Sequence, residues 1–387
     1  MKVCFVTTSF PRWPGDGQGA FIWEAARAIK RQGVQVRVVA MHSPGARTYE
    51  VMEGIEVIRP RYWWPEKWEL LKKEGGGLPI VWRKYPLARF QILPFIFAHS
   101  LATARYAQDC DLIHAHWTLS AAVAVLGKWK HRRRILGTVH GSDIFQVARH
   151  PVGGSITREA LKRCDYVVAV SNALMKAAIA LGVDPKKIQV VSNGVNTDVF
   201  APPSDDCREK TILYVGSLIE RKGVKYLILA LPEILRNFPD YRLVLIGDGH
   251  ELQILRTLAN ELGVANRVEF LGFVGHGEVR KWMQRAQLVV LPSLEEAQGV
   301  VLLESLSCGT PVVASQVDGI PDVISPDVGI LVPPAVPAAL SRAIQVILGN
   351  PTLWANMSRC ARERAVIYYD WNVVARQWID LYACMTT

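Results

Sequence analysis

The 387-residue sequence is poor in cysteine, and its few cysteines form no pattern. There are seven, an odd number, and no two of them are separated by only two residues: Cys4, Cys110, Cys164, Cys207, Cys308, Cys360 and Cys384. This scatter excludes a disulfide framework and a cysteine-based zinc site. Unpaired thiols of this kind are typical of a protein from a reducing cytoplasm.

Long apolar runs and targeting signals are also missing. The longest apolar stretches, Phe90–Ala98 and Leu119–Gly127, are shorter than the ~20 residues that span a bilayer. The sequence opens with Met1–Val6, which indicates a buried strand and not a signal peptide. We therefore expect a cytoplasmic protein.

Several enzyme signatures are absent: the Gly-x-Gly-x-x-Gly fingerprint, a Walker loop, the kinase motifs and a Ser-His-Asp arrangement. Three glycines, Gly15, Gly17 and Gly19, do precede a helix that we expect to begin near Ala20. Glycines at such a place let a ligand approach the backbone. A long turn between strand and helix is the alternative.

The excess of positive charge lies entirely in the first half of the chain. Through Val195 there are 28 lysines and arginines against 14 aspartates and glutamates, whereas the remainder has 17 against 21. This asymmetry suggests an anionic partner for the first half, either a membrane surface or a nucleic acid. The alternative is that the basic charge only keeps the protein soluble.

What the sequence does contain is a repeated alternation of strands and helices, enough for two α/β domains. Thirteen buried strands are expected: 3–7, 34–40, 55–59, 111–115, 134–140, 166–171, 188–192, 211–215, 242–246, 268–271, 288–291, 311–314 and 329–332. Ala201–Asp206 is proline-rich and indicates a linker. We predict two doubly wound Rossmann-like domains facing each other across a cleft, residues 1–200 and 201–365, with a C-terminal helix at about 366–387.

One stretch predicts a ligand site. A buried strand at 288–291 is followed by a loop with Glu296, a helix from near Gly299 that carries Glu304, and another strand. The free N–H groups of the helix would face an anion, and Glu304 would accept hydrogen bonds from hydroxyls of the same ligand. An anion beside a diol describes a nucleotide sugar. A surface helix with two solvated glutamates is the alternative.

Three further residues are candidates for the same chemistry. Arg221 and Lys222, in the loop after the strand at 211–215, could hold a diphosphate and stabilise it as a leaving group. Taken alone, such a loop is usually a solvated turn. His140 ends a strand of the other domain and could face the sugar, although a histidine at a strand end is more often structural.

No metal site is expected. His114 and His116 share one face of a strand, but no carboxylate or cysteine stands at ligand spacing. Asp109-Cys-Asp111 has the spacing of an Asp-x-Asp metal motif, but it precedes its strand instead of following it.

Residues 60–98 depart from the α/β rhythm, because tryptophans there alternate with lysine and arginine beside an apolar segment. This pattern suits contact with a membrane surface, base stacking on a nucleic acid or a buried aromatic cluster over a helix. If the contact is with a membrane, binding to anionic vesicles should fall with salt and fall again when Trp63, Trp64 and Trp82 become alanine.

With these residues in view, the chain resembles the family 4 retaining glycosyltransferases (glycosyl transferases group 1), which have the two-domain GT-B architecture. The resemblance covers essentially the whole chain. The resemblance rests on five motifs: the two glutamates Glu296 and Glu304 with seven residues between them, Cys308-Gly-Thr-Pro-Val-Val-Ala, Gly319-Ile-Pro-Asp322, the Gly216-Ser-Leu…Arg-Lys-Gly223 loop and Asn193-Gly-Val-Asn196.

The resemblance implies roles by position. The donor diphosphate would be held by Arg221, Lys222 and the backbone of Gly299 and Val300, and approached by Gly17 and Gly19. The ribose would bind Glu304, the base would lie near Val274, and the transferred sugar would contact Glu296 and His140. In this family the final helix returns to the first domain, which would place residues 371–382 there.

This sequence departs from the family pattern at three places. It has Glu296-Ala-Gln-Gly299 where many members have Glu-Gly-Phe-Gly, Gly216-Ser-Leu218 where many have Gly-Arg-Leu, and Gly15-Asp-Gly-Gln-Gly19 in place of a Gly-Gly pair. These differences bear on the shape of the sugar pocket and on which groups touch the donor phosphates.

The resemblance implies an enzyme of the EC 2.4 class, a hexosyltransferase that needs no metal or cofactor. It would move a sugar from a UDP- or GDP-type donor to a lipid-linked or cell-surface polysaccharide acceptor, by a front-side mechanism. The basic first half would place it on the inner face of the membrane. A nucleotide-sugar epimerase or phosphorylase on the same fold is the alternative, and a basic nucleic-acid-binding protein is a third.

Overall fold

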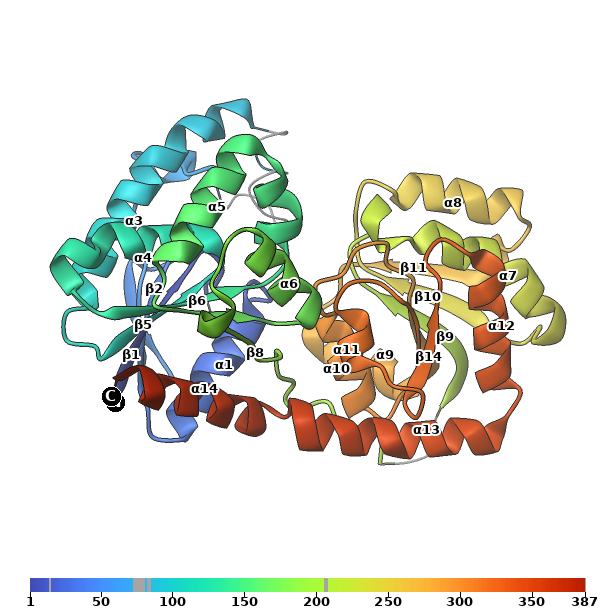
Figure 1. Ribbon diagram of the computed structural model, residues 1–387. Helices are drawn as coiled ribbons and strands as arrows, with labels where there is room; N and C mark the ends of the chain where they lie inside the picture. Colours follow the sequence, from blue (N-terminus) through green and yellow to red (C-terminus); the bar gives the residue numbers. More distant parts are fainter. Residues whose placement is uncertain (14, 72–80, 82–84, 205–207, 387) are drawn as a thin grey trace. The chain divides into compact units, whose positions relative to one another are not determined.

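The computed structural model describes residues 1–386 except 14, 72–80, 82–84 and 205–207. The chain forms two compact units (Figure 1). Unit 1 comprises Met1–Val170, Leu174–Val191 and Val374–Thr387, and unit 2 comprises Ser171–Ala173 and Ser192–Val373. The sequence predicted the change of domain at residue 200, whereas in the structure it falls before Ser192.

Unit 1 is built on an eight-stranded sheet in the order β3-β4-β2-β1-β5-β6-β7-β8. Every neighbouring pair is parallel except β3–β4. The strands are β1 (Lys2–Thr7), β2 (Gln35–Ala40), β3 (Tyr49–Met52), β4 (Ile55–Ile58), β5 (Leu112–His116), β6 (Arg134–Val139), β7 (Tyr166–Ala169) and β8 (Ile188–Val190).

Helices cover both faces of this sheet, which buries the strands on both sides. In Figure 1, α3, α4 and α5 lie on one face, and α1 and α14 lie on the other. The helices of unit 1 are α1 (Ala20–Arg31), α3 (Ile92–Tyr106), α4 (Thr118–His131), α5 (Pro151–Arg163), α6 (Asn172–Ala180) and most of α14 (Trp371–Thr386).

Unit 2 has a six-stranded, fully parallel sheet in the order β11-β10-β9-β12-β13-β14. Its strands are β9 (Glu209–Val215), β10 (Arg242–Ile246), β11 (Val268–Gly272), β12 (Ala286–Leu291), β13 (Val312–Ser315) and β14 (Gly329–Val332). Its helices are α7 (Val224–Asn237), α8 (Leu252–Glu261), α9 (His276–Arg285), α10 (Val300–Ser307), α11 (Ile320–Val323), α12 (Pro337–Leu348) and α13 (Pro351–Arg364). The predicted pair of doubly wound α/β domains is confirmed.

The last helices connect the two units. After α13 the chain passes through a π-helical turn, Ala365–Tyr369, into α14, and from Val374 onward α14 belongs to unit 1. There Tyr382 is fully buried, and its hydroxyl lies 2.6 Å from Nδ1 of His114 on β5. Trp371, at the start of α14, remains in unit 2, where its ring covers Gly194.

The segment 60–98 combines a small core with an exposed helix. Tyr62 and Phe95 are buried in the same cluster, and their rings meet edge to face at 5.7 Å. Trp63 is half-buried against this cluster, and Trp82 lies outside the described residues. One continuous helical segment, Pro86–Tyr106, is long and apolar enough to cross a bilayer by length and composition. Of its apolar 18-residue stretch, 39% is buried in the protein.

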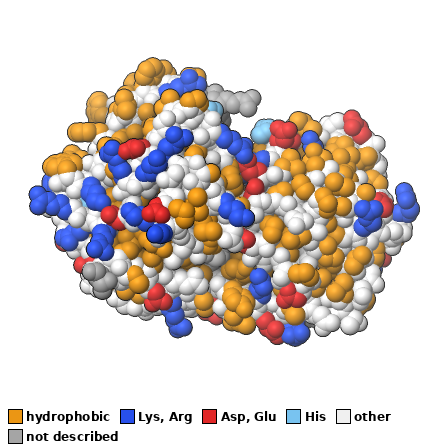
Figure 2. Space-filling view, viewed as in Figure 1, with side chains coloured by type: hydrophobic (Ala, Val, Ile, Leu, Met, Phe, Trp, Pro, Cys, Tyr) orange, Lys and Arg blue, Asp and Glu red, His pale blue; other side chains and the backbone are white. Residues whose placement is uncertain are grey.

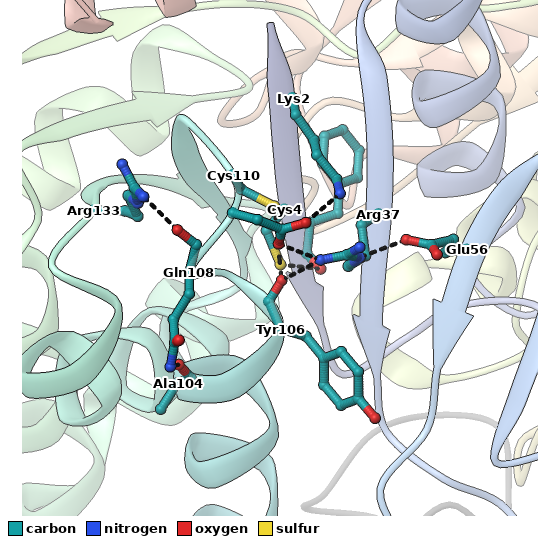
Figure 3. A network of polar contacts seen from close by, with 11 residues as sticks. Lys2, Cys4, Arg37, Glu56, Ala104, Tyr106, Gln108, Cys110 and Arg133 are labelled. Carbon is teal, nitrogen blue, oxygen red and sulfur yellow. Dashed lines mark hydrogen bonds and ion pairs between the residues drawn. The ribbon is translucent and has the colours of Figure 1, made fainter.

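The Asp-x-Asp pair lies at the amino-terminal edge of the unit 1 sheet and has a structural role. Figure 3 shows three residues of the network around it, Lys2, Arg37 and Glu56. Asp109 accepts from Lys2 at 2.6 Å and from Arg37 at 2.5 Å, and Asp111 accepts from the backbone N–H of Lys2 at 2.7 Å. Arg37 also pairs with Glu56 at 2.6 Å. These contacts join β1, β2, β4 and the start of β5, as expected for an ion-pair network and not for a metal site.

Candidate active site

The strand order of unit 2 reverses beside β9. From β9 the chain proceeds outward to β10 and β11, and it then returns to the other side of β9 for β12, β13 and β14. In open parallel sheets, ligands bind outside the carboxyl ends of the strands at such a reversal. The two loops that leave this point, after β9 and after β12, carry Arg221, Lys222 and Glu296.

Lys222 and Glu296 meet at the reversal. The Nζ of Lys222 forms a close ion pair with Oε2 of Glu296, and their side chains are 15% and 11% exposed. Ser293 donates to the same carboxylate oxygen at 3.3 Å. The backbone N–H of Glu296 is bound by Asp318 at 3.0 Å, which fixes the residue from a third loop. The site therefore holds a cation and an anion together in a largely water-excluded position.

Close backbone contacts lock the two loops together. The carbonyl of Arg221 accepts from the N–H groups of Leu294 at 2.7 Å and Glu295 at 3.3 Å. Gly223 has φ +63°, and a Cβ there would lie 2.1 Å from the carbonyl oxygen of Pro292. Only glycine permits this approach, so the loop that carries the basic pair is held rigidly against the loop that carries Glu296.

Helix α10 begins where the β12 loop ends. Gly299 caps it with φ +82° and has no side chain to bond the first N–H groups. The free N–H groups around Gly299 and Val300, with the positive end of the helix dipole, form an anion-binding terminus. The sequence prediction that this helix starts near Gly299 is accurate to the residue.

Glu304 lies in the second turn of α10 and is 8% exposed. Burial raises the pKa of its carboxyl to about 8. The nearest basic group is His276 on α9, whose Nδ1 lies 3.9 Å from Oε1, too far for a hydrogen bond. A buried carboxyl that lacks a strong internal partner suits a ligand that supplies hydroxyl donors.

Gln298 has a role that the sequence did not reveal. Its Oε1 accepts from the backbone N–H of Asn193 at 3.0 Å and from Nδ2 of Asn193 at 2.7 Å, and its Nε2 donates to Ser192 Oγ. Gln298 is 2% exposed. It therefore fastens the Glu296 loop to the segment with which unit 2 begins, in place of the aromatic residue common in similar sequences.

Val274 follows β11, at the carboxyl edge of the same sheet. It packs half-buried against the core of unit 2. The structure thus places Arg221, Lys222, Val274, Glu296, Gly299, Val300 and Glu304 on one edge of unit 2.

Unit 1 has its own reversal, between β1 and β5. The loop after β1 is braced by Arg12, which forms a bidentate pair with Asp16 at 2.7 and 3.0 Å. A Cβ on Gly19 (φ +63°) would lie 2.5 Å from the Ser9 carbonyl oxygen, whereas a Cβ on Gly17 would meet nothing within 4 Å. Gly19 is therefore required by the fold itself, while Gly17 faces open space.

His140 follows β6 at the same edge as the glycine loop. The ring of Phe21, in the first turn of α1, lies 5.2 Å from the His140 ring. Burial lowers the pKa of His140 to about 3, so the imidazole is neutral at physiological pH. Its Nε2 lies 3.1 Å from Nδ1 of His116, and its Nδ1 is buried without a partner among the described residues. That nitrogen is the one available to a ligand.

Asp143 fixes the backbone at His140, and His114 lies behind His116. Asp143 accepts from the backbone N–H groups of Gly141 at 2.9 Å and of His140 at 3.3 Å, and burial raises its pKa to about 6. His114 uses both ring nitrogens internally, with Tyr382 at 2.6 Å and Thr138 at 2.7 Å. Across the described residues, no three His, Cys, Asp or Glu side chains are grouped as metal ligands.

The sequence matches known proteins over almost its full length. The model of Glycosyltransferase Family 4 matches residues 15–199, and that of Glycosyl transferases group 1 matches residues 197–364. The phosphatidyl-myo-inositol mannosyltransferase of Mycobacterium leprae is 30% identical, covering 97% of this chain and 94% of its own. The chain is a family 4 glycosyltransferase.

Solved structures agree on the architecture of this glycosyltransferase. The sucrose-phosphate synthase of Thermosynechococcus elongatus superimposes with a TM-score of 0.79 at 24% identity, covering 100% of this chain and 99% of its own. Anabaena HepE in complex with UDP-glucose gives a TM-score of 0.77 at 21% identity, covering 99% and 100%. The predicted GT-B fold and the prediction of an EC 2.4 transferase are confirmed.

Proposed function

We propose that this glycosyltransferase moves a hexose from a UDP- or GDP-type sugar to a lipid-linked or cell-surface glycan acceptor, with retention and without a metal ion. The Lys222–Glu296 pair at the strand reversal of unit 2 carries this proposal. The pair places a cation for the diphosphate in direct contact with an anion for the sugar hydroxyls, beside the amino terminus of α10. The HepE complex with UDP-glucose supports the class of donor.

Each group has a task that follows from its charge and position. Arg221, Lys222 and the N–H groups of Gly299 and Val300 neutralise the diphosphate. Glu304 accepts from the ribose hydroxyls, and the base packs near Val274. Glu296 orients the hexose. In the free protein Lys222 is already paired with Glu296, so donor binding exchanges one anionic partner of Lys222 for another and frees the Glu296 carboxylate for the sugar.

In the proposed reaction the bond between the anomeric carbon and the diphosphate oxygen breaks, and the electron pair leaves with the diphosphate. The acceptor hydroxyl attacks the same face, and its proton passes to the departing phosphate oxygen. Arg221 and Lys222 stabilise the charge that develops on the diphosphate. From unit 1, the neutral imidazole of His140 binds the sugar, and Gly17 and Gly19 approach the diphosphate.

The acceptor is the less constrained part of the proposal. The mannosyltransferase relative is named for a phospholipid acceptor, and the first half of this chain has the excess of positive charge. Both favour a lipid-linked acceptor handled at the inner face of a membrane.

A thermal-shift screen against nucleotide sugars tests the donor, since only a ligand that binds the folded state raises the melting temperature. We expect one UDP- or GDP-sugar to stabilise the protein, and Lys222→Met to abolish the shift. Lys281→Met is the matched control, because Lys281 lies on α9 with 60% exposure. NMR of the product should show the anomeric configuration of the donor. Inversion, or activity abolished by EDTA, would contradict the mechanism.

A further inference from the structure

An apolar stripe runs along one side of the helical segment Pro86–Tyr106. Five large side chains are exposed there: Leu87 (71%), Phe90 (74%), Leu93 (72%), Phe97 (71%) and Leu101 (49%). Leu87 and Phe90 are three residues apart on the 3-10 helix Pro86–Gln91, and Leu93, Phe97 and Leu101 are four residues apart on α3. These spacings keep the five side chains on one side of the segment. We call these five residues the α3 stripe. Exposed apolar surface of this extent marks an interaction site in a soluble protein.

The opposite face fixes this segment to unit 1. Phe95 and His99 are buried, and their rings meet edge to face at 5.0 Å. On α4, a Cβ on Gly127 would lie 3.1 Å from the carbonyl oxygen of Ser100 and 3.4 Å from Cβ of Ala104, so α3 and α4 approach closely. The stripe is therefore the outward face of a helix already packed on the protein, and it is presented along its whole length.

The segment that carries the stripe and the helix packed behind it contain basic residues and no acidic ones. The segment Pro86–Tyr106 contains Arg89 and Arg105, both exposed, and no aspartate or glutamate. Helix α4, packed against it, also lacks acidic residues and ends in Lys128, Lys130 and His131. In Figure 2, hydrophobic and basic side chains lie together over the part of unit 1 where α3 and α5 are seen.

An exposed tryptophan, Trp68, lies next to the stripe, and a second, Trp64, precedes it by four residues. Gln91 donates to the carbonyl of Trp68 at 2.6 Å, which holds the Trp68 backbone against the base of the helix. Trp68 is 58% exposed and Trp64 is 83% exposed. Tryptophan side chains favour the headgroup level of a bilayer, where one part of the ring is apolar and the N–H remains hydrated.

We propose that the α3 stripe docks unit 1 on an anionic lipid bilayer, with the helix lying in the plane of the interface. Phe90 and Phe97 enter the acyl boundary, while Arg89 and Arg105 extend to lipid phosphates. Charge complementarity selects this occupant over a second copy of the chain, because two such faces would bring arginines against arginines. The docking rests on the proposed function only in that it would hold the enzyme beside a lipid-linked acceptor.

Flotation of the full-length protein with vesicles tests this assignment without donor or acceptor. Vesicles of phosphatidylcholine alone are compared with vesicles containing about 30% phosphatidylglycerol, in low and high salt. Three variants are measured: Phe90→Glu with Phe97→Glu, Arg89→Gln with Arg105→Gln, and the control Ile254→Glu with Val346→Glu. The control residues are exposed apolar positions on helices of unit 2, 62% and 53% exposed.

The wild type and the unit 2 control should bind the anionic vesicles equally. The phenylalanine variant should bind at least about tenfold more weakly, and the arginine variant should lose most of its salt dependence. Unchanged melting temperatures show that the variants are folded. Equal binding by the phenylalanine variant overturns the proposal. So does a wild-type dimer in sedimentation that the same variant dissociates, since the stripe would then bind a second copy.

The same variants separate this proposal from the catalytic one. Stabilisation by the nucleotide sugar should be the same in the wild type and the phenylalanine variant, because none of the proposed donor-binding residues belongs to the stripe. Vesicle binding without donor binding would refute only the proposed function. Donor binding without vesicle binding would refute only the docking surface.

Discussion

Glu304 is a buried carboxyl whose pKa, about 8, lies far above the usual value of an exposed glutamate. In the unfolded chain this group ionises near pH 4.3. Between those two pH values the unfolded state is ionised while the folded state keeps its proton, so raising the pH favours unfolding. Glu304 thus lowers the stability of the folded protein at neutral pH. Such destabilising residues are common in binding sites, where a bound ligand supplies the missing hydrogen bonds.

We predict that Glu304→Gln removes this pH dependence. The variant should gain stability over the wild type as the pH rises from about 4.5 to 8, by on the order of 5 kcal/mol. The two proteins should then differ by a constant amount above pH 8. Urea denaturation at pH 5 and pH 8 measures the difference. An equal difference at both pH values would show that Glu304 is ionised in the folded protein.

A second prediction concerns the donor. Hydrogen bonds from ribose hydroxyls favour the ionised carboxylate, so binding of the nucleotide sugar should expel a proton from Glu304 at pH 7. Calorimetry in buffers of different ionisation enthalpy should report a release approaching one proton. Glu304→Gln should bind more weakly and release none. If the variant releases as many protons as the wild type, another group is responsible.

At the scale of elements, the strands could be predicted because each is a short apolar run bounded by polar loops. The exception is β3 (Tyr49–Met52), which pairs antiparallel with β4. Its hairpin depends on Glu53 and Gly54 at φ +45° and +74°, a two-residue turn with positive φ at both positions. Glutamate is not a residue that usually indicates such a turn, so the local signal was weak.

The candidate site was predictable to the extent that its residues are neighbours in sequence. Glu296, Gly299 and Glu304 follow one another within a single loop and helix, and their positions agree with the prediction. Gln298 contacts Asn193, 105 residues earlier in the chain. Such a pairing follows only from the fold. Because it ties Ser192 and Asn193 to the Glu296 loop, these residues belong to unit 2 although they precede the proline-rich linker.

We expect Gln298→Ala to loosen this connection. The substitution leaves the N–H and side-chain amide of Asn193 buried without their acceptor, at a cost of about 2 kcal/mol. The melting temperature should fall by several degrees, and a nucleotide sugar should bind more weakly because the Glu296 loop is less fixed. Gln253→Ala, which removes an exposed amide on α8, is the control and should change neither quantity.

The whole molecule divides its properties between its two units. Unit 1 comprises most of the basic first half and the α3 stripe, whereas unit 2 contains most of the proposed donor-binding residues and has a slight excess of acidic residues. The charge asymmetry could be recognised in the sequence. The interleaved aromatic and basic residues of 60–98 also suggested contact with a membrane. Which apolar side chains are exposed could not be predicted, because Leu87, Phe90, Leu93 and Phe97 alternate with residues that the structure buries.

Helix α14 makes the stability of unit 1 depend on the end of the chain. The Tyr382 hydroxyl is the partner of His114 Nδ1 in a fully buried position, and burial lowers the pKa of His114, so the ring is neutral. Tyr382→Phe should therefore cost about 2 kcal/mol, by leaving that nitrogen without a partner. Hydrogen exchange should become faster in β5 and β6 of unit 1 and stay unchanged in β9 and β12 of unit 2. The control Tyr368→Phe, at a 56% exposed tyrosine of unit 2, should change neither the stability nor the exchange rates. Equal acceleration of exchange in both sheets would mean that the two units unfold as one.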